Sequence, residues 1–276
     1  MESRYLPDQA RTKTLDTQGL RDAFLVETVF APGKVNLFHF DTDRAVIGGA
    51  MPTTAPLVLE APPELRATYF CERREIGIIN IAAAGKITCD DKTFHVKTRE
   101  CVYVGRGTKK VTFESDDPAN PAAFYLTSFP AHTAYPTTHA GLDKARIKEI
   151  GNQEEANKRR LHQYIHMEGI RSCQLVMGFT EIEPGNCWNT QPPHTHTRRC
   201  ELYFYFDLAP EGIMMHFMGT PDETRHIVMK DRQAVASPVW SMHFGAGTRN
   251  YRFIWAMGGE NQAFDDMDHV PLNRLR

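Results

Sequence analysis

Short runs of β-branched and aromatic residues recur along most of the chain, and Gly, Pro, Asn or Asp often separates one run from the next. Runs of this length and composition predict β-strands joined by turns. Clear examples are CVYVG, CQLVMGFTEI, ELYFYFDL and YRFIWAM. Because short strands far outnumber helical patterns, we expect a mainly β fold built as a sandwich or barrel.

One charged stretch, residues 141–163, interrupts this pattern and contains few apolar residues. Its oppositely charged pairs at i, i+4 spacing, such as Glu155 with Arg159, favour a short helix. We expect a junction here, with an N-terminal domain over 1–145 and a C-terminal domain over 146–276. A chain of 276 residues is long enough for two such halves.

An internal repeat supports two halves of similar fold. Three pairs of segments match in the same order along the chain: VIGGAMP (46–52) with VMGFTEI (176–182), ERREIGIINI (72–81) with RRCELYFYFD (198–207), and GRGTKKVTF (105–113) with GAGTRNYRF (245–253). The last pair shares the pattern G-x-G-T-x-x-x-x-F. Three matches in one order are hard to explain by chance, so we expect one β-roll in each half.

Residues that bind metals gather in the second half. His194 and His196 lie two positions apart on an expected strand, so both imidazoles project from one face, about 7 Å apart. Glu201 lies an odd number of residues further on, so a turn near 197–199 must return its carboxylate to the same side, on the adjacent strand. His243, two residues before the repeated glycine, supplies a fourth ligand.

Strand parity and the repeat extend this prediction. Tyr203 shares the inward face of Glu201 and is a candidate acid or hydrogen-bond donor. In the first half the repeat aligns Glu75 with Glu201, but Tyr103 stands at the position of His243. We therefore expect one metal ion per chain, in the second half, and an N-terminal domain without metal ligands. Three imidazoles and a carboxylate suit Zn, Fe, Ni or Mn better than Ca or Mg, and the sequence leaves that choice open.

Composition narrows the class of partner. The chain has 32 basic and 34 acidic residues and no long run of one sign, which argues against binding to nucleic acid or a membrane surface. Neither an apolar signal segment nor a run of about 18 apolar residues is evident, so we expect a cytoplasmic protein. Six scattered cysteines without a C-x-x-C pair are expected to be reduced. A small-molecule substrate fits these features.

Two segments carry a resemblance to a known superfamily. PGNCWNTQPPHTHTRRCE and SPVWSMHFGAG resemble the two motifs of the cupins, in which H-x-H, a Glu and a later His hold one divalent ion inside a β-barrel. Longer blocks, including CQLVMGFTEIEPGNCWNT and GENQAFDDMDHV, resemble the 4-deoxy-L-threo-5-hexosulose-uronate ketol-isomerase (5-keto-4-deoxyuronate isomerase) family from end to end. One departure is Thr138-His139 after AHTAYPT, where the family leads us to expect basic residues.

The resemblance implies a zinc-containing bicupin, usually a homohexamer, with its ligands at His194, His196, Glu201 and His243. It implies conversion of 5-dehydro-4-deoxy-D-glucuronate to 3-deoxy-D-glycero-2,5-hexodiulosonate in pectin and uronate catabolism. This aldose–ketose isomerisation moves a proton between C2 and C1, or a hydride, and a metal would assist as a Lewis acid.

Several roles stay open at this level. The general base is not identified. The fork of an arginine suits the substrate carboxylate, and Arg198, Arg199 and Arg225 are the candidates. The acidic segment 264–270 is expected near a barrel mouth. Two other functions use the same fold: an Fe(II)-dependent dioxygenase, which would consume oxygen, and a non-catalytic sugar-binding cupin.

Overall fold

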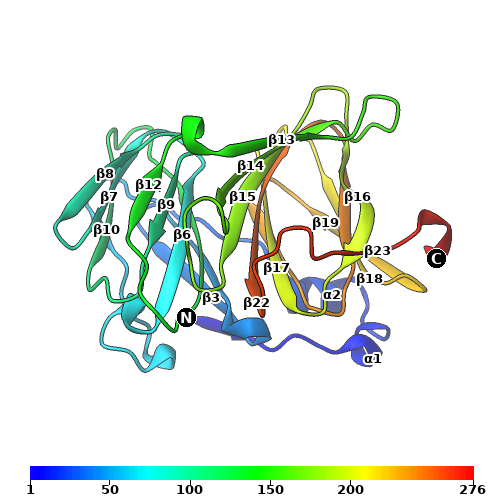
Figure 1. Cartoon of the computed structure of the whole chain (residues 1–276), viewed down its shortest axis with the longest axis horizontal. Coiled ribbons are helices and arrows are strands. Elements are labelled where there is room, and N and C mark those ends of the chain that lie inside the picture. Colours follow the sequence, from blue (N-terminus) through cyan, green and yellow to red (C-terminus); the bar gives the residue numbers. More distant parts are fainter. The chain divides into compact units, whose positions relative to one another are not determined.

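Strands make up most of the regular structure in the computed structural model, which describes all residues 1–276 (Figure 1). They form four sheets, and the helices are few and short. The mainly β prediction is therefore confirmed. None of the helices is long and apolar enough to cross a membrane.

The chain divides into two units. Unit 1 comprises Met1–Arg4, Thr28–Ala145 and Tyr164–Val176, and unit 2 comprises Tyr5–Glu27, Arg146–Gln163 and Met177–Arg276.

Unit 1 is built around a seven-stranded sheet in the order β1-β3-β4-β11-β6-β9-β12 and a four-stranded sheet in the order β5-β10-β7-β8. Its strands are β1 (Glu2–Arg4), β3 (Val35–Phe40), β4 (Val46–Ala50), β5 (Leu57–Val58), β6 (Arg74–Asn80), β7 (Gly85–Cys89), β8 (Lys92–Val96), β9 (Cys101–Val104), β10 (Val111–Ser115), β11 (Phe124–Pro130) and β12 (Thr138–Ala140). Short 3-10 turns are η1 (Thr42–Arg44), η2 (Pro63–Leu65), η3 (Phe70–Glu72) and η4 (Leu142–Lys144). An apolar core that includes Ile76, Ile78 and Phe113 fills the unit.

Unit 2 is built around a seven-stranded sheet in the order β13-β14-β15-β22-β17-β20-β2 and a five-stranded sheet in the order β19-β18-β21-β16-β23. Its elements are α1 (Gln9–Thr12), α2 (Thr17–Phe24), β2 (Leu25–Val26), β13 (Arg146–Ile150), β14 (Arg159–Ile165), β15 (Val176–Ile182), β16 (Trp188–Thr195), β17 (Arg199–Phe206), β18 (Met214–Thr220), β19 (Glu223–Met229), β20 (Gln233–Ser237), β21 (His243–Gly247), β22 (Arg252–Gly259), β23 (Asp268–His269) and η5 (Leu272–Arg274). The last residues of β14 and the first of β15 are counted in unit 1.

The two halves repeat one strand order. The sequence β3-β4-β11-β6-β9 in the larger sheet of unit 1 corresponds to β14-β15-β22-β17-β20 in unit 2, and β5-β10-β7-β8 corresponds to β16-β21-β18-β19. The expected internal repeat of two β-rolls is therefore confirmed. Two of the three segment matches join equivalent strands, since β4 corresponds to β15 and β6 to β17.

The third segment match is wrong. Residues 105–113 lead from β9 into β10, whereas residues 245–253 lead from β21 into β22. The strand order makes β10 the counterpart of β21, so the match is displaced by one strand. His243 opens β21, and its counterpart lies at the start of β10 instead of at Tyr103. A glycine-rich turn before a strand can recur at several places in such a fold, because turns need the same residues wherever they occur.

The two observed units do not match a single boundary after residue 145, because two segments belong to the other unit. Residues 5–27 belong to unit 2, where β2 pairs with β20 through Leu25 and Val235. Residues 164–176 belong to unit 1, where three backbone N–H groups of this segment donate to the carboxylate of Glu75. Both assignments depend on contacts far apart in the sequence.

The short helix expected in the charged junction is wrong. The chain there forms the antiparallel pair β13 and β14, with Ile150 opposite Arg159. The carboxylate of Glu155 accepts hydrogen bonds from the Asn152 and Asn157 side chains in the connecting turn. A helical i, i+4 pair contributes only about 0.2–0.5 kcal/mol, too little to compete with a hydrogen-bonded strand ladder.

Candidate metal centre

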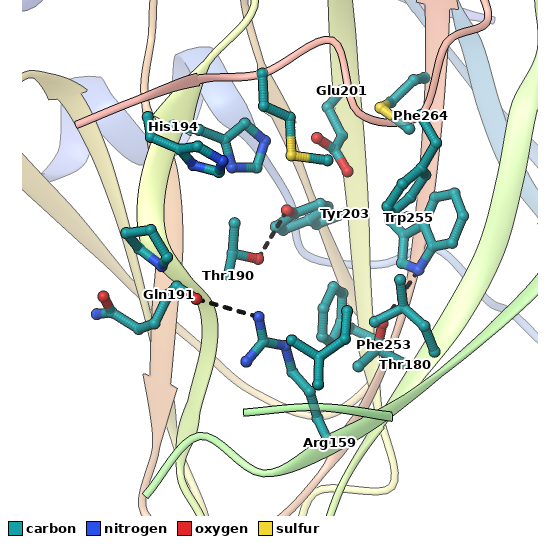
Figure 2. A pocket seen from close by; sticks show the side chains of 16 residues that line it. Arg159, Thr180, Thr190, Gln191, His194, Glu201, Tyr203, Phe253, Trp255 and Phe264 are labelled. Carbon is teal, nitrogen blue, oxygen red and sulfur yellow. Dashed lines mark hydrogen bonds between the residues drawn. The ribbon is translucent and has the colours of Figure 1, made fainter. Parts of the chain in front are cut away.

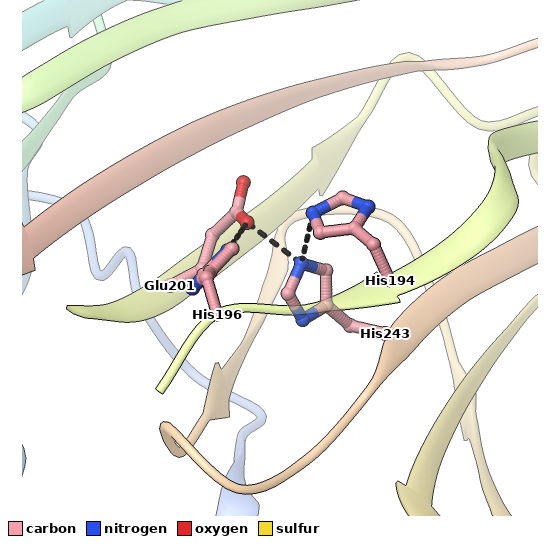
Figure 3. A group of neighbouring side chains, drawn as sticks. All are labelled: His194, His196, Glu201 and His243. Carbon is pink, nitrogen blue, oxygen red and sulfur yellow. Dashed lines mark hydrogen bonds and ion pairs between the residues drawn. The ribbon is translucent and has the colours of Figure 1, made fainter. Parts of the chain in front are cut away.

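Four side chains of unit 2 meet at one point (Figure 3). His194 lies near the end of β16, His196 follows in the turn after it, Glu201 is in β17, and His243 opens β21. Each offers one ligand atom, and these atoms all lie within 4.8 Å of one another; all four residues are buried. The structure thus brings together the four residues that the sequence pointed to.

The two sheets of unit 2 each contribute ligands. His194 and His243 face each other across β16 and β21, with their Nε2 atoms 3.1 Å apart. Oε2 of Glu201 lies 3.1 Å from Nε2 of His196 and 2.8 Å from Nε2 of His243. The expectation that Glu201 sits on the strand adjacent to the histidines needs correction, because β17 belongs to the other sheet. The turn between β16 and β17 carries the chain from one sheet to the other.

Hydrogen bonds outside the cluster orient two of the rings. Nδ1 of His196 lies 2.8 Å from the carbonyl oxygen of Arg199, to which it donates. Nδ1 of His243 lies 3.0 Å from the hydroxyl of Ser237. When each Nδ1 carries the proton, the lone pair on Nε2 faces the cluster, which is the tautomer a metal requires.

The electrostatics of the cluster suit a cation. Burial lowers the pKa of His194 well below its ordinary value, and neighbouring His243 lowers it further, so this imidazole is neutral at pH 7. Burial alone would raise the pKa of Glu201, but His243 and a hydrogen bond from His196 outweigh it and hold that pKa well below its usual range. Three imidazole nitrogens and one carboxylate are a ligand set that fits a divalent transition-metal ion.

A cavity of about 240 Å³ adjoins the cluster (Figure 2). His194 and Glu201 form part of its wall. Its apolar lining is Ile150, Leu161, Pro192, Phe253, Trp255, Met257, Phe264 and Met267. A few polar groups interrupt that lining, which is the usual composition of a small-molecule site.

Tyr203 lies in this cavity, as strand parity predicts. Its hydroxyl is 3.1 Å from that of Thr190. Burial raises the pKa of Tyr203 well above its ordinary value, and the charge of Glu201 adds to the effect. The phenol therefore keeps its proton at neutral pH and can donate a hydrogen bond. Tyr205 lies on the same face of β17, but its hydroxyl is 2.9 Å from Nδ1 of His216.

The arginines proposed from the sequence have other partners, and the cavity lining includes none of them. Arg198 forms ion pairs with Asp266 at 2.6 Å and Asp268 at 2.9 Å. Arg225 donates to backbone carbonyls of residues 12, 13 and 15. Their suggested role in binding substrate stays a prediction.

Arg199 holds a segment that lines the cavity. Its side chain is 0% exposed and donates to the carbonyls of Ala263, Phe264 and Asp266. Phe264, Met267 and His269 of this segment line the cavity. The acidic segment 264–270 thus contributes to the wall of the cavity, with β23 paired to β16 at His194.

Arg159 is the cavity arginine that sequence reasoning missed. Its i, i+4 spacing from Glu155 suggested a partner on an exposed helix. The signal in the sequence was its place at the start of a run, RRLHQYI, that forms the largely buried strand β14.

Glu75, the counterpart of Glu201 in unit 1, has a different environment. Its carboxylate accepts the Tyr103 hydroxyl at 2.8 Å and the N–H groups of Cys173, Gln174 and Leu175 at 2.7 to 3.0 Å. All four donors are groups of the protein itself, one hydroxyl and three backbone N–H groups, and none of them is a metal ligand. Glu75 is thereby committed to holding the 173–175 segment in place.

Two β-rolls of equal strand order, one of them holding a His-x-His, Glu and His cluster, define this chain as a bicupin with a candidate metal centre in its second half. Residues 24–272 match the KduI/IolB family. Relatives from Caldicellulosiruptor bescii and Escherichia coli (strain SMS-3-5 / SECEC), both named 4-deoxy-L-threo-5-hexosulose-uronate ketol-isomerase, are each 48% identical over the full length of both chains. The chain belongs to the KduI/IolB family.

Solved structures agree on the fold. An IolB-like protein from Salmonella typhimurium LT2 superposes with a TM-score of 0.74 at 12% identity, covering 90% of this chain and 96% of that one. Oxalate decarboxylase from Lactobacillus farciminis superposes with a TM-score of 0.57 at 11% identity, covering 90% of each chain. At such low identity the likeness concerns the fold alone.

Proposed function

We propose that this chain is a metal-dependent ketol-isomerase that converts 5-dehydro-4-deoxy-D-glucuronate to 3-deoxy-D-glycero-2,5-hexodiulosonate. The full-length relatives carry the name of this activity. The structural observation that supports it most directly is the cluster of His194, His196, Glu201 and His243 beside a cavity with a mainly apolar lining.

The residues have separable roles in the proposed reaction. The four cluster residues would hold a divalent ion, which when bound would supply Lewis-acid polarisation of a substrate carbonyl. Tyr203 holds a proton on its hydroxyl and donates it toward a substrate oxygen. The apolar side chains around the cavity exclude water from the carbon that loses its proton.

Several finer points belong to the same proposal. They are zinc as the metal, one ion per chain, a homohexameric assembly, a cytoplasmic location and a role in pectin breakdown. The family resemblance implies zinc, the hexamer and the pathway, whereas the single ion per chain is inferred from the internal repeat and the location from the sequence composition. Metal analysis of the purified protein and native mass measurement test the first three.

The deciding experiment measures conversion of 5-keto-4-deoxyuronate before and after a chelator strips the metal, with oxygen excluded and zinc added back. We expect activity to disappear on stripping and to return with zinc in the absence of oxygen. A return that needs oxygen and ferrous ion would instead identify a dioxygenase. No turnover under any condition would refute the isomerase.

A further inference from the structure

One buried cation lies in the cavity without an anionic partner. Arg159, the first residue of β14, is 7% exposed, and its side chain lines the cavity. It donates to the carbonyl of Asn157 at 2.8 Å and to that of Gln191 at 3.3 Å, and it forms no ion pair with any carboxylate. Since a guanidinium carries five N–H donors, these two contacts leave most of its donor capacity unused.

An unpaired buried charge is costly, so its position calls for a reason. Burial lowers the pKa of Arg159, which reflects the loss of water around the group. An arginine remains protonated in proteins even so. Two backbone carbonyls could be satisfied by a neutral amide, and they do not account for the positive charge.

The position of Arg159 within the cavity is informative. Figure 2 shows its side chain reaching in from the side opposite His194 and Glu201, with Thr190 and Tyr203 between them. The cavity therefore has a metal-binding end and a cationic end. A substrate with a carbonyl at one end of a short carbon chain and a carboxylate at the other has the same polarity.

The backbone beside Arg159 is shaped for this arrangement. Thr190 has φ +52, a left-handed conformation that is unfavourable for a β-branched residue. In this conformation the Thr190 hydroxyl meets that of Tyr203, and the next carbonyl, of Gln191, meets Arg159. One strained residue within β16 thus positions both polar groups that face the cavity.

We propose that the Arg159 guanidinium binds the carboxylate of the substrate, fixes its orientation with C1 and C2 at the metal end, and makes the enzyme select uronates over neutral sugars. This proposal rests on the proposed function for the identity of the substrate. A planar guanidinium can donate two parallel hydrogen bonds to a carboxylate, which an ammonium cannot match.

The test compares Arg159→Gln and Arg159→Lys with a control, Arg160→Gln, whose side chain is partly exposed and pairs with Glu183. Hydrogen bonds to a charged group are worth enough that Arg159→Gln should raise KM for 5-keto-4-deoxyuronate about 10- to 100-fold, with a much smaller change in kcat. Arg159→Lys should show an intermediate KM, and Arg160→Gln the KM of the parent. Metal content should not change in any variant.

A binding measurement makes the proposal independent of turnover. D-glucuronate and its neutral counterpart D-glucose are titrated into the metal-loaded protein, and binding is followed by calorimetry. The parent should prefer glucuronate, and Arg159→Gln should lose that preference. If the parent turns over the keto-uronate but Arg159→Gln keeps both its KM and its preference, the carboxylate role is refuted while the isomerase stands.

If the parent has no isomerase activity, the preference for glucuronate still decides whether Arg159 is a carboxylate site. If Arg159→Gln does not fold, Arg159→Lys carries the test, because it retains the charge. An unchanged KM in a folded Arg159→Lys variant would rule out two-point binding by the guanidinium.

Discussion

The rings of His196 and His243 are oriented by groups that do not bind the metal, the carbonyl of Arg199 and the hydroxyl of Ser237. Both partners lie within six residues of the histidine they hold. At the scale of single residues, the site is therefore assembled by local geometry: a turn after β16 places one acceptor, and the end of β20 places the other.

Tyr203 is expected to contribute to turnover and not to metal binding. Tyr203→Phe removes only the hydroxyl, so it should lower kcat at least 10-fold if that group donates a proton, while leaving the metal content per chain unchanged. Steady-state kinetics and elemental analysis of the same preparation check both points. Parent-like kinetics would remove Tyr203 from the mechanism.

His216 is expected to make stability depend on pH. Burial lowers the pKa of His216 to about 3, so the folded protein keeps this ring neutral, whereas the unfolded chain protonates it below about pH 6.5. The contribution of His216 to the free energy of unfolding is therefore constant above pH 6.5. It falls by about 1.4 kcal/mol per pH unit as the pH drops from 6.5 toward 3.

The matched variant for this effect is His216→Asn, whose amide oxygen can still accept from the Tyr205 hydroxyl. Urea unfolding of both metal-free proteins at pH 7 and pH 5 should show the parent losing about 2 kcal/mol more than the variant. Equal losses would mean that His216 is protonated in the folded state.

At the scale of elements, two neighbouring arginines hold the segment 264–270, which lines the cavity, through different partners. Arg199 donates to its backbone, and Arg198 pairs with Asp266 and Asp268. The hydrogen bond and charge of Arg198 hold the pKa of Asp266 well below its ordinary value. We infer that Arg198 acts on the substrate through the position of this segment.

Arg198→Ala and Asp266→Asn should therefore each raise KM several-fold, and the double variant should be no worse than Arg198→Ala alone, because Arg198→Ala already removes the ion pairs with both Asp266 and Asp268. Substrate saturation curves for the three proteins measure this. A rise in Arg198→Ala alone would instead support direct contact between Arg198 and the substrate.

At the scale of the whole molecule, two rolls with the same strand order have separate uses for an equivalent carboxylate. Glu201 faces three imidazoles, whereas Glu75 accepts four hydrogen bonds from protein groups. The first roll keeps the scaffold and uses its glutamate to hold the chain that returns through residues 173–175.

Glu75→Gln should lower the free energy of unfolding without changing the metal content. The amide nitrogen cannot accept, so two of the four donors lose their partner, at about 1–3 kcal/mol each. Urea unfolding measures the change in stability and metal analysis the metal content, with Glu114→Gln in β10 as the control. A fall in metal content would contradict the assignment of a single site to the second roll.

Patterns among neighbouring residues predicted some side-chain positions correctly and missed those that depend on distant segments. Strand alternation placed Tyr203 on the face of Glu201, and the structure has both in the cavity wall. The same local reasoning failed at Arg159. The i, i+4 spacing of Glu155 and Arg159 predicted a helix, but Arg159 lies in a strand and pairs with Ile150 across a turn. Local reasoning also misaligned His243 with Tyr103, since the true counterpart is defined by strand order.

The sequence by itself determined the strand-rich fold, the two-roll repeat and the residue types of the metal cluster, because side-chain alternation and ligand chemistry are properties of neighbouring residues. Only the tertiary structure decided that Arg159 faces the cavity, that Arg198 has carboxylate partners and that residues 5–27 join unit 2. Each of these depends on contacts between segments distant in the chain, and no local pattern encodes which distant segment will be the neighbour.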